Sequence, residues 1–364
     1  MKDSIDVVYV VASKLGTIGM GTAAYNAIKQ LEHSELSYKI FCRGYNRKLE
    51  LNNKNIISAG YLEYLSLPLR FMEKKLHFKI NPFGYINKKF GNFVLKNLPE
   101  CKIYHTWPGI SPESINKAKK EGAFLILEAA NSHPMNSAKI MNDEYEKFGM
   151  NEYIVNIDKI KNDSDIYKNF DYIMCPSNFV FDSFLREGFR KEKLVLMPYG
   201  TDVKKFHPTS QSHSGIKFIF VGSIQLRKGI QYLFKAWEEL NFKNAELIVV
   251  GRVWPDAKKI VDKYKNNSTI RFCGVDSNLK KYYSEADVFV FPSLEEGSAL
   301  VNYEAMASGI PIIATLNAGS VARDKKDGFI IPIRNTEKLK EKMRYFYNNP
   351  SEIQRMGKNA RKRV

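Results

Sequence analysis

The stretch from Val288 to Thr315, VFVFPSLEEGSALVNYEAMASGIPIIAT, decides the fold prediction. The short apolar run Asp287–Phe291 ends at a proline and predicts a buried parallel strand. An apolar, Ala-rich helix is expected from about Ala299 to Ser308. Gly309 and the proline two residues later end this helix, and Ile312–Ala314 is the next expected strand. A strand, a loop, a helix and a second strand in this order are typical of a doubly wound α/β sheet.

The loop between this strand and this helix carries acidic residues. Loops at the carboxyl ends of parallel strands, where a helix begins, bind phosphorylated ligands because backbone N–H groups and the helix dipole favour anions. Glu296 lies on the loop and Glu304 lies in the helix, about 8 to 10 Å apart at about 1.5 Å per residue. We predict a diphosphate between them, with ribose hydroxyls at Glu304 and hexose hydroxyls at Glu296. The other donor-binding candidates here are Gly297, Ser298, Ala299 and Leu300.

The spacing Glu296-x7-Glu304, within the longer pattern PS-x-EEG…EA-x-A-x-G-x-P, resembles the signature of retaining, GT-B-fold glycosyltransferases of family 4. Three further segments resemble this family in the same order: MPYGTDVKKFHP (Met197–Pro208), FVGSIQLRKGIQYLFKAW (Phe220–Trp237) and IRFCGVDSNLKKYYSEADVFVFPS (Ile270–Ser293). The resemblance implies two Rossmann-like domains that face each other across a cleft. It also implies transfer of a hexose from a nucleoside diphosphate sugar to an acceptor hydroxyl with retention of configuration. The expected role is in surface polysaccharide or glycolipid synthesis.

Strands and helices alternate along the whole chain, which predicts two parallel sheets with right-handed crossovers. The first predicted strand series is Val7–Ala12, Tyr38–Cys42, Ile103–His105, Phe124–Glu128, Tyr172–Cys175 and Leu194–Met197. The second is Lys217–Val221, Glu246–Val250, Ile270–Phe272, Val288–Phe291, Ile312–Ala314 and Phe329–Ile331. We predict an acceptor-side domain over residues 1–205 and a donor-binding domain over residues 206–364. Similar family members continue with a helix that returns to the first domain, so a chain that stops at Val364 is expected to be naturally short or truncated.

Two cations follow the first strand of the second series. Arg227 and Lys228 precede a helix, where positive charge is unfavourable unless an anion offsets it. A departing nucleoside diphosphate gains negative charge, so these cations would stabilise the transition state. The resemblance places an arginine directly after Gly222, but this chain has Ser223, so Arg227 is expected to substitute. The alternative is an exposed turn. Gly222 and Val275 are further donor-binding candidates by resemblance.

The first domain offers candidates near the acceptor. The glycine loop that begins at Gly16 has the order G-x-x-G-x-G, which departs from the dinucleotide fingerprint, and the resemblance assigns Gly19 and Gly21 to the cleft wall. His133, in ANSHP, resembles the histidine that faces the transferred sugar from the first domain; an incidental loop histidine is the alternative. The acceptor candidates are His105 and Trp107, the latter with a flat face on which a sugar can stack.

The formal net charge of +17 indicates an anionic partner. No nucleic-acid module is recognisable, so nucleic acid is not predicted. The segment Arg70–Lys102 interleaves basic and aromatic residues, which favours an anionic membrane surface, unless the aromatics belong to a core. The residues are Lys74, Lys75, Lys79, Lys88, Lys89 and Lys96 with Phe71, Phe78, Phe83, Tyr85, Phe90 and Phe93. The amino terminus does not resemble a signal peptide, so a cytoplasmic location, peripheral on the inner membrane face, is expected.

No metal and no cofactor are predicted, because cationic side chains and helix dipoles can stabilise the diphosphate. The D-x-D match Asp163–Asp165 is better explained as a helix N-cap. The four cysteines lie far apart and are expected to be buried thiols. Two alternative functions remain: a sugar-nucleotide epimerase of the same fold, and a non-catalytic partner subunit that has lost its donor site.

Overall fold

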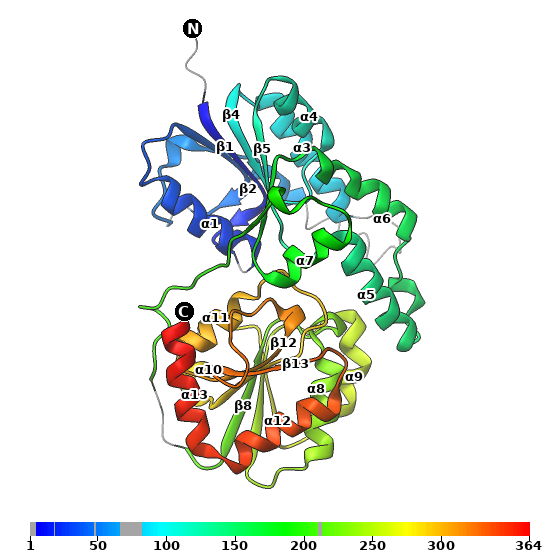
Figure 1. The fold of residues 1–364 in the computed structure, drawn as a ribbon, viewed down its shortest axis with the longest axis vertical. Helices are drawn as coiled ribbons and strands as arrows, with labels where there is room; N and C mark the ends of the chain where they lie inside the picture. The colour runs from blue at the N-terminus through cyan, green and yellow to red at the C-terminus, as the bar shows by residue number, and fades with distance from the viewer. Residues whose placement is uncertain (1–4, 18, 47–48, 66–81, 210–212) are drawn as a thin grey trace. The chain divides into compact units, whose positions relative to one another are not determined.

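A computed structural model describes residues 5–17, 19–46, 49–65, 82–209 and 213–364 (Figure 1). The chain divides into two compact units. The first unit contains residues 1–130, 162–175 and 188–195, and the second contains residues 131–161, 176–187 and 196–364. The single domain boundary predicted between residues 205 and 206 stays a prediction, as does the cleft.

The first unit is built on a seven-stranded sheet with the order β3-β2-β1-β4-β5-β6-β7. In this order, the six strands from β3 through β6 are all parallel to their neighbours within that group. The strands are β1 (Ile5–Leu15), β2 (Tyr38–Tyr45), β3 (Ile56–Ser58), β4 (Cys101–Thr106), β5 (Phe124–Glu128), β6 (Tyr172–Cys175) and β7 (Leu194–Leu196). Strand β1 is central, and Val8, Val10 and Val11 are fully buried, which explains its continuous apolar sequence. The sequence did not predict β3, because three residues show no periodicity.

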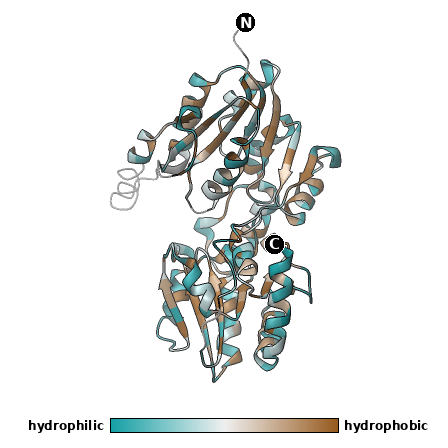
Figure 2. Cartoon of the chain, turned by 90° about the vertical axis from the view of Figure 1, so that its left-hand side faces the viewer, coloured by the Kyte–Doolittle hydropathy of each residue, from teal (hydrophilic) through white to brown (hydrophobic). Residues whose placement is uncertain are grey.

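The second unit is built on a six-stranded, fully parallel sheet with the order β10-β9-β8-β11-β12-β13. The strands are β8 (Ile216–Val221), β9 (Ala245–Val250), β10 (Ile270–Gly274), β11 (Val288–Phe291), β12 (Ile312–Thr315) and β13 (Gly328–Ile331). All six agree with the predicted second series to within two residues at each end. Figure 2 shows apolar residues concentrated on the strands. Phe218, Phe289 and Ile313 are among the residues that are completely buried in this core.

Helices connect the strands of both sheets. In the first unit they are α1 (Met20–Leu31), α3 (Pro82–Asn97) and α4 (Pro112–Lys120), with the short turns η1 (Asn53–Asn55), η3 (Asp165–Asn169) and η4 (Lys191–Lys193). Helix α6 (Ile157–Ser164) joins the two units in sequence. In the second unit they are α5 (Pro134–Lys147), α7 (Asn178–Arg186), α8 (Ile230–Leu240), α9 (Lys258–Tyr264), α10 (Leu279–Glu285), α11 (Leu300–Ala307), α12 (Thr336–Asn348) and α13 (Pro350–Arg363), with η2 (Asn151–Tyr153), η5 (Leu226–Lys228), η6 (Pro255–Ala257) and η7 (Leu316–Ala318).

Helix α11 ends as the sequence predicts. Gly309 has a left-handed φ of 78°, and its N–H donates to the Met306 carbonyl at 2.9 Å. The next N–H, of Ile310, donates to the Ala305 carbonyl at 3.1 Å. These two bonds form a Schellman motif, which satisfies carbonyls at the helix end and turns the chain directly into β12.

Candidate functional site

The strand order of the second sheet reverses between β8 and β11, which makes the carboxyl ends of these two strands the topological switch point. Ligands of open α/β sheets bind in this position. The turn after β8 carries Arg227 and Lys228, and the loop after β11 carries Glu295 and Glu296. The two groups of predicted site residues therefore come together at the edge of one sheet.

Gly229 allows the turn and the loop to touch. Its φ is 71°, and a Cβ atom built on it would lie 2.0 Å from the Pro292 carbonyl oxygen. The Leu294 N–H donates to the Arg227 carbonyl at 2.8 Å, so backbone atoms join the two segments directly. A residue with a side chain would separate them.

Glu295 is the most buried carboxylate of the loop, with 1% exposure. Its Oε2 lies 3.1 Å from Arg227 Nη1. Its Oε1 accepts hydrogen bonds from the Ser132 N–H at 3.1 Å and the Ser132 hydroxyl at 2.9 Å. The sequence analysis missed Glu295. The spacing to Glu304 points to Glu296 and cannot show that Glu295 binds Arg227, the Ser132 N–H and the Ser132 hydroxyl.

Glu296 is also buried, and it forms ion pairs with both cations. Its carboxylate contacts the Lys228 ammonium, and its Oε1 lies 3.5 Å from Arg227 Nη1. Lys228 is 7% exposed, so the predicted alternative of an exposed turn is wrong. The anion that we expected these cations to require is supplied, in the protein itself, by Glu295 and Glu296.

The two cations differ in their environment. Burial, then the nearby Arg227 guanidinium, lower the pKa of Lys228 well below its ordinary value of 10.5, while Glu295 acts in the opposite direction. The Lys228 ammonium also lies 5.5 Å from the centroid of the Phe291 ring. The Lys228 ammonium is therefore desolvated and lies beside the last residue of β11. An anionic ligand would interact with it more strongly there than in water.

Glu304 lies on α11 and is partly exposed. Its Oε2 accepts a hydrogen bond from the Tyr283 hydroxyl at 3.1 Å. Burial raises the pKa of Glu304 above 4.5, although the Tyr283 bond and the Lys205 charge lower it. Tyr283 thus orients the carboxylate predicted to bind ribose. The separation of Glu296 and Glu304 stays a prediction.

The start of α11 differs from the prediction at one residue. We expected the N–H groups of residues 298–300 to face the ligand. The Ala299 N–H instead donates to the Ala318 carbonyl at 3.2 Å. The Leu300 and Val301 N–H groups have no acceptor within the described part of the chain, so they are the donors that a ligand can use.

Three contacts hold the loop before α11. The Ser298 hydroxyl donates to the Gly319 carbonyl at 2.7 Å, and it lies 2.9 Å from the Tyr303 hydroxyl. The Ser177 hydroxyl donates to the Gly297 carbonyl at 2.6 Å. The contacts of Gly297 and Ser298 therefore fix the backbone of the loop before α11. The Ser298 hydroxyl already contacts the Gly319 carbonyl and the Tyr303 hydroxyl.

Helix α5 contacts helix α8 and Arg334 of the same unit through a buried carboxylate. Glu144 is completely buried, and its Oε1 accepts bonds from Gln231 at 2.9 Å and from the Tyr232 hydroxyl at 2.7 Å. Its Oε2 accepts a bond from Arg334 Nε at 2.6 Å. This cluster holds the end of α5, whereas the bonds between Ser132 and Glu295 hold the residues before its start beside the acidic loop.

His133 belongs to the second compact unit, although the resemblance placed it on the first domain. Its Nδ1 accepts a bond from the Met135 N–H at 3.2 Å and caps α5. Its own N–H donates to the Ser183 hydroxyl at 2.8 Å, and the residue is 3% exposed. The contact of His133 with a sugar stays a prediction. Its Nδ1 is already used as an acceptor in the helix cap.

The remaining donor candidates lie at strand ends of the second sheet. Gly222 follows β8, and its N–H donates to the Val250 carbonyl at 2.9 Å. A Cβ atom on the neighbouring Gly251 would lie 1.8 Å from the Gly222 carbonyl oxygen, so the backbones are in close contact. Val275 follows β10 and is 67% exposed. Their contacts with a nucleotide stay predictions.

In the first unit, the glycine loop follows β1. Gly19 is exposed, has a φ of 85° and begins α1. A Cβ atom on Gly21 would lie 2.2 Å from the Lys14 carbonyl oxygen, so this position requires glycine for packing. The assignment of Gly19 and Gly21 to a donor site stays a prediction.

His105 and Trp107 belong to a buried polar network. His105 Nε2 lies 3.3 Å from Glu128 Oε2, which accepts a bond from the Tyr9 hydroxyl at 3.0 Å. Trp107 Nε1 donates to this hydroxyl at 2.7 Å. Trp107 is only 1% exposed, so most of its ring is buried, and its stacking with a sugar stays a prediction. Local pattern did not indicate Glu128 and Tyr9 as part of a network, because both lie in otherwise apolar strands.

The basic and aromatic segment is described only in part. Lys88, Lys89 and Lys96 on α3 are exposed, as is Tyr85, whereas Phe90 is completely buried. Lys74, Lys75, Lys79, Phe71 and Phe78 lie outside the described residues, as does the side chain of Phe83. Within the described ranges, no helix combines the length and apolar character that crossing a membrane requires. The membrane surface stays a prediction.

The D-x-D match is not an N-cap. Asp163 lies in the last turn of α6, and Asp165 begins η3 and pairs with Lys168 at 2.6 Å. Three of the four cysteines are buried and the fourth, Cys273, is partly exposed; all are free thiols, as expected.

Comparison with known proteins gives the family resemblance and the fold. Residues 203–363, which are less than half of the 364 residues, match the family described as glycosyl transferases group 1. Alpha-monoglucosyldiacylglycerol synthase of Acholeplasma laidlawii is 26% identical over 216 residues, which cover 53% of this chain and 53% of that protein. The chain spans about half the length of the curated relatives it matches, from 42% to 54% for three others.

Several solved structures match nearly the whole chain, and two of them serve as examples. WaaG, a glycosyltransferase involved in lipopolysaccharide biosynthesis, is 14% identical with a TM-score of 0.68, and the match covers 98% of this chain and 94% of WaaG. HepE of Anabaena, in complex with UDP and glucose, is 11% identical with a TM-score of 0.67 and the same coverage. The chain therefore has the α/β fold of GT-B glycosyltransferases, as the sequence predicted.

Proposed function

We propose that this protein is a retaining glycosyltransferase that transfers a hexose from a nucleoside diphosphate sugar to an acceptor hydroxyl. One observation carries the proposal: Arg227, Lys228, Glu296 and the start of α11 are joined at the switch point of the second sheet. The family match over residues 203–363 supports the transferase class. The UDP and glucose of the HepE complex support a nucleotide-sugar donor.

The donor diphosphate is proposed to bind the Lys228 ammonium, the Arg227 guanidinium and the Leu300 and Val301 N–H groups. A diphosphate near Lys228 competes with Glu296 for the ammonium. Glu296 is then available to accept hydrogen bonds from hexose hydroxyls. Glu304, oriented by Tyr283, accepts hydrogen bonds from the ribose hydroxyls.

In the proposed reaction, the bond between the anomeric carbon and the diphosphate oxygen breaks, and a bond to the acceptor oxygen forms on the same face. The diphosphate leaves with the electron pair of the broken bond, and its oxygen accepts the proton of the acceptor hydroxyl. Lys228 and Arg227 stabilise the negative charge that grows on the diphosphate. We propose that His133 contacts the transferred sugar.

The reaction is proposed to need no metal and no cofactor, because two cations and a helix start already face the diphosphate. Treatment with EDTA should leave the rate unchanged. Loss of turnover that magnesium or manganese restores would contradict this part of the proposal.

The acceptor is proposed to be a glycan or a lipid-linked sugar of surface polysaccharide or glycolipid synthesis, at the cytoplasmic face of a membrane. The names of WaaG and of the Acholeplasma synthase support this class. No nucleic-acid partner is proposed.

A transfer assay tests the function. The purified protein is incubated with UDP-, GDP- and ADP-hexoses and a mixture of glycan and glycolipid acceptors, and NMR reads the anomeric configuration of the product. Retention supports the proposal, and inversion contradicts the stereochemistry. Conversion of the donor alone into an epimer would favour the epimerase. Absence of donor binding would favour the non-catalytic subunit.

A further inference from the structure

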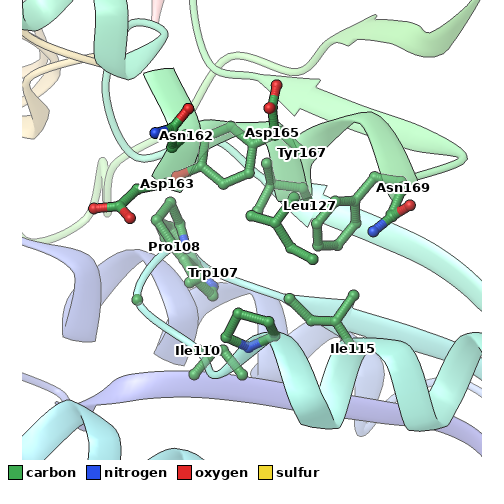
Figure 3. A pocket seen from close by; sticks show the side chains of 14 residues that line it. Trp107, Pro108, Ile110, Ile115, Leu127, Asn162, Asp163, Asp165, Tyr167 and Asn169 are labelled. Carbon is green, nitrogen blue, oxygen red and sulfur yellow. The ribbon is translucent and has the colours of Figure 1, made fainter. Parts of the chain in front are cut away.

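The first unit contains a pocket of about 670 Å³ between the loop after β4, helix α4 and the turn η3 (Figure 3). Ligand pockets commonly have volumes of about 300 to 1,000 Å³, so this one has the volume to hold a small molecule. It is lined by Trp107, Pro108, Gly109, Ile110, Pro112, Ile115, Leu127, Asn162, Asp163, Asp165, Ile166, Tyr167, Asn169 and Phe170.

The two sides of the pocket differ in polarity. Figure 3 shows Ile110 and Ile115 on one side and Asn162 and Asp163 on the opposite side. Ile115 and Leu127 are almost fully buried and form an apolar floor. Asn162 and Asp163 are exposed and form a polar rim. A molecule with an apolar part and a polar part matches this arrangement.

The charge of the lining restricts the polar part. The chain has a net charge of +17, yet no lysine or arginine lines the pocket. Lys168 is paired with Asp165 at 2.6 Å, and Lys119 donates to Asn169 at 3.1 Å, so the nearby cations already have partners. Asp163 has no hydrogen-bond donor within the ranges that the structure describes. A phosphate or a carboxylate would be repelled here, because it would face an unneutralised carboxylate.

Sugar hydroxyls suit the same rim. A carboxylate and an amide oxygen accept hydrogen bonds from hydroxyl groups, and charge-assisted bonds of this kind are the stronger ones. We propose that this pocket binds an uncharged, hydroxyl-bearing amphiphile, with its hydroxyls at Asn162 and Asp163 and its alkyl part on Ile110, Ile115 and Leu127. The inference rests on the proposed function only in assigning this ligand to the acceptor. It favours a neutral glycolipid over a lipid phosphate.

Binding of three probes, all below their micelle-forming concentrations, tests the proposal without any donor. Octyl β-D-glucoside carries both parts, glucose carries only the hydroxyls, and octyl phosphate carries the same chain with an anionic head. Calorimetry gives the affinities, and NMR of isoleucine methyl groups locates the ligand. Octyl glucoside should shift the methyl signals of Ile110 and Ile115 and bind at least tenfold more tightly than glucose or octyl phosphate. Equal binding of octyl phosphate, or shifts elsewhere only, would overturn the proposal.

Two variants sharpen the test. Ile110→Glu places a charge on the apolar side and should weaken octyl glucoside at least tenfold, whereas Leu36→Glu, on an exposed residue of the same unit, should not. Asp163→Lys should allow octyl phosphate to bind at least tenfold more tightly. Glu337→Lys, which changes the net charge equally on α12 of the second unit, should not have this effect. If the two charge variants behave alike, Asp163 does not select the ligand.

The result is independent of the transferase assignment. If the protein binds octyl glucoside here but no nucleotide sugar, the pocket proposal is supported and the proposed function is contradicted. A protein that binds a nucleotide sugar but no octyl glucoside keeps the function and loses the pocket.

Discussion

The close contact at Gly229 gives the most direct structural prediction. Gly229→Ala must keep a left-handed φ of 71° and accommodate a Cβ atom 2.0 Å from the Pro292 carbonyl oxygen. Ordinary contact begins at 3.4 Å, so the two backbones must separate by about 1.4 Å (3.4 minus 2.0). The left-handed conformation costs about 1 to 2 kcal/mol. Forcing atoms into a packed region costs about 1 to 3 kcal/mol more.

Gly149→Ala is the matched control. Gly149 has a φ of 64° in the same unit, but a Cβ atom there meets nothing within 4 Å. Urea unfolding, followed by the fluorescence of Trp237 and Trp254 in this unit, should show Gly229→Ala to be about 1 to 3 kcal/mol less stable than Gly149→Ala. Donor binding should fall only in Gly229→Ala, because the cation turn moves away from the acidic loop. Equal loss of stability in both variants would refute the reasoning.

Three further predictions concern the acidic residues and the charged surface. Glu295→Ala should cost about 1 to 3 kcal/mol in urea unfolding, because it leaves both Ser132 donors without their acceptor and removes one of the two carboxylates that pair with Arg227. Glu295→Gln should recover part of this loss. The exposed Glu341→Ala should change the stability little, and equal effects of the two alanine variants would contradict the buried role of Glu295. The raised pKa of Glu304 means that the folded state binds more protons, so its stability contribution falls as pH rises through that pKa. Glu304→Gln should therefore flatten the dependence of Tm on pH above 4.5, be more stable than wild type at pH 7 and bind the donor less tightly. An unchanged dependence of Tm on pH would show that folding does not raise the pKa of Glu304. The protein should sediment with vesicles that contain anionic lipid at low salt and dissociate from them at high salt. The double variant Lys88→Glu, Lys89→Glu should weaken this binding. If the protein does not sediment with the vesicles at low salt, the predicted binding to an anionic membrane surface is wrong.

Much of the fold follows from local patterns. Buried parallel strands such as β11 are continuous apolar runs, and Gly309 marks the end of α11 because its left-handed φ suits glycine. The cations Arg227 and Lys228 could be found from their place after a strand. These features depend on residues that are close together along the chain, so they can be predicted from a single sequence.

The rest depends on contacts between distant residues. Ser132 bonds Glu295 across 163 positions, so spacing alone could not show which of two adjacent glutamates is the buried one. Trp107 was expected to be open, but the Tyr9 hydroxyl, 98 positions away, holds its indole in the core. The Ala299 N–H was expected to be free, yet the turn η7 returns the Ala318 carbonyl to it. Each difference comes from a tertiary partner that local pattern does not contain.

Donor binding at the switch point is the central claim, and calorimetric titration with UDP-, GDP- and ADP-hexoses tests it most directly. One of these donors should bind wild type, and Lys228→Ala should weaken it by about tenfold or more, since a charge-assisted hydrogen bond contributes about 1.5 to 3 kcal/mol. Lys235→Ala, on the exposed side of α8, should bind the donor as wild type does. No affinity for any of the three donors, or undiminished affinity in Lys228→Ala, would contradict the account.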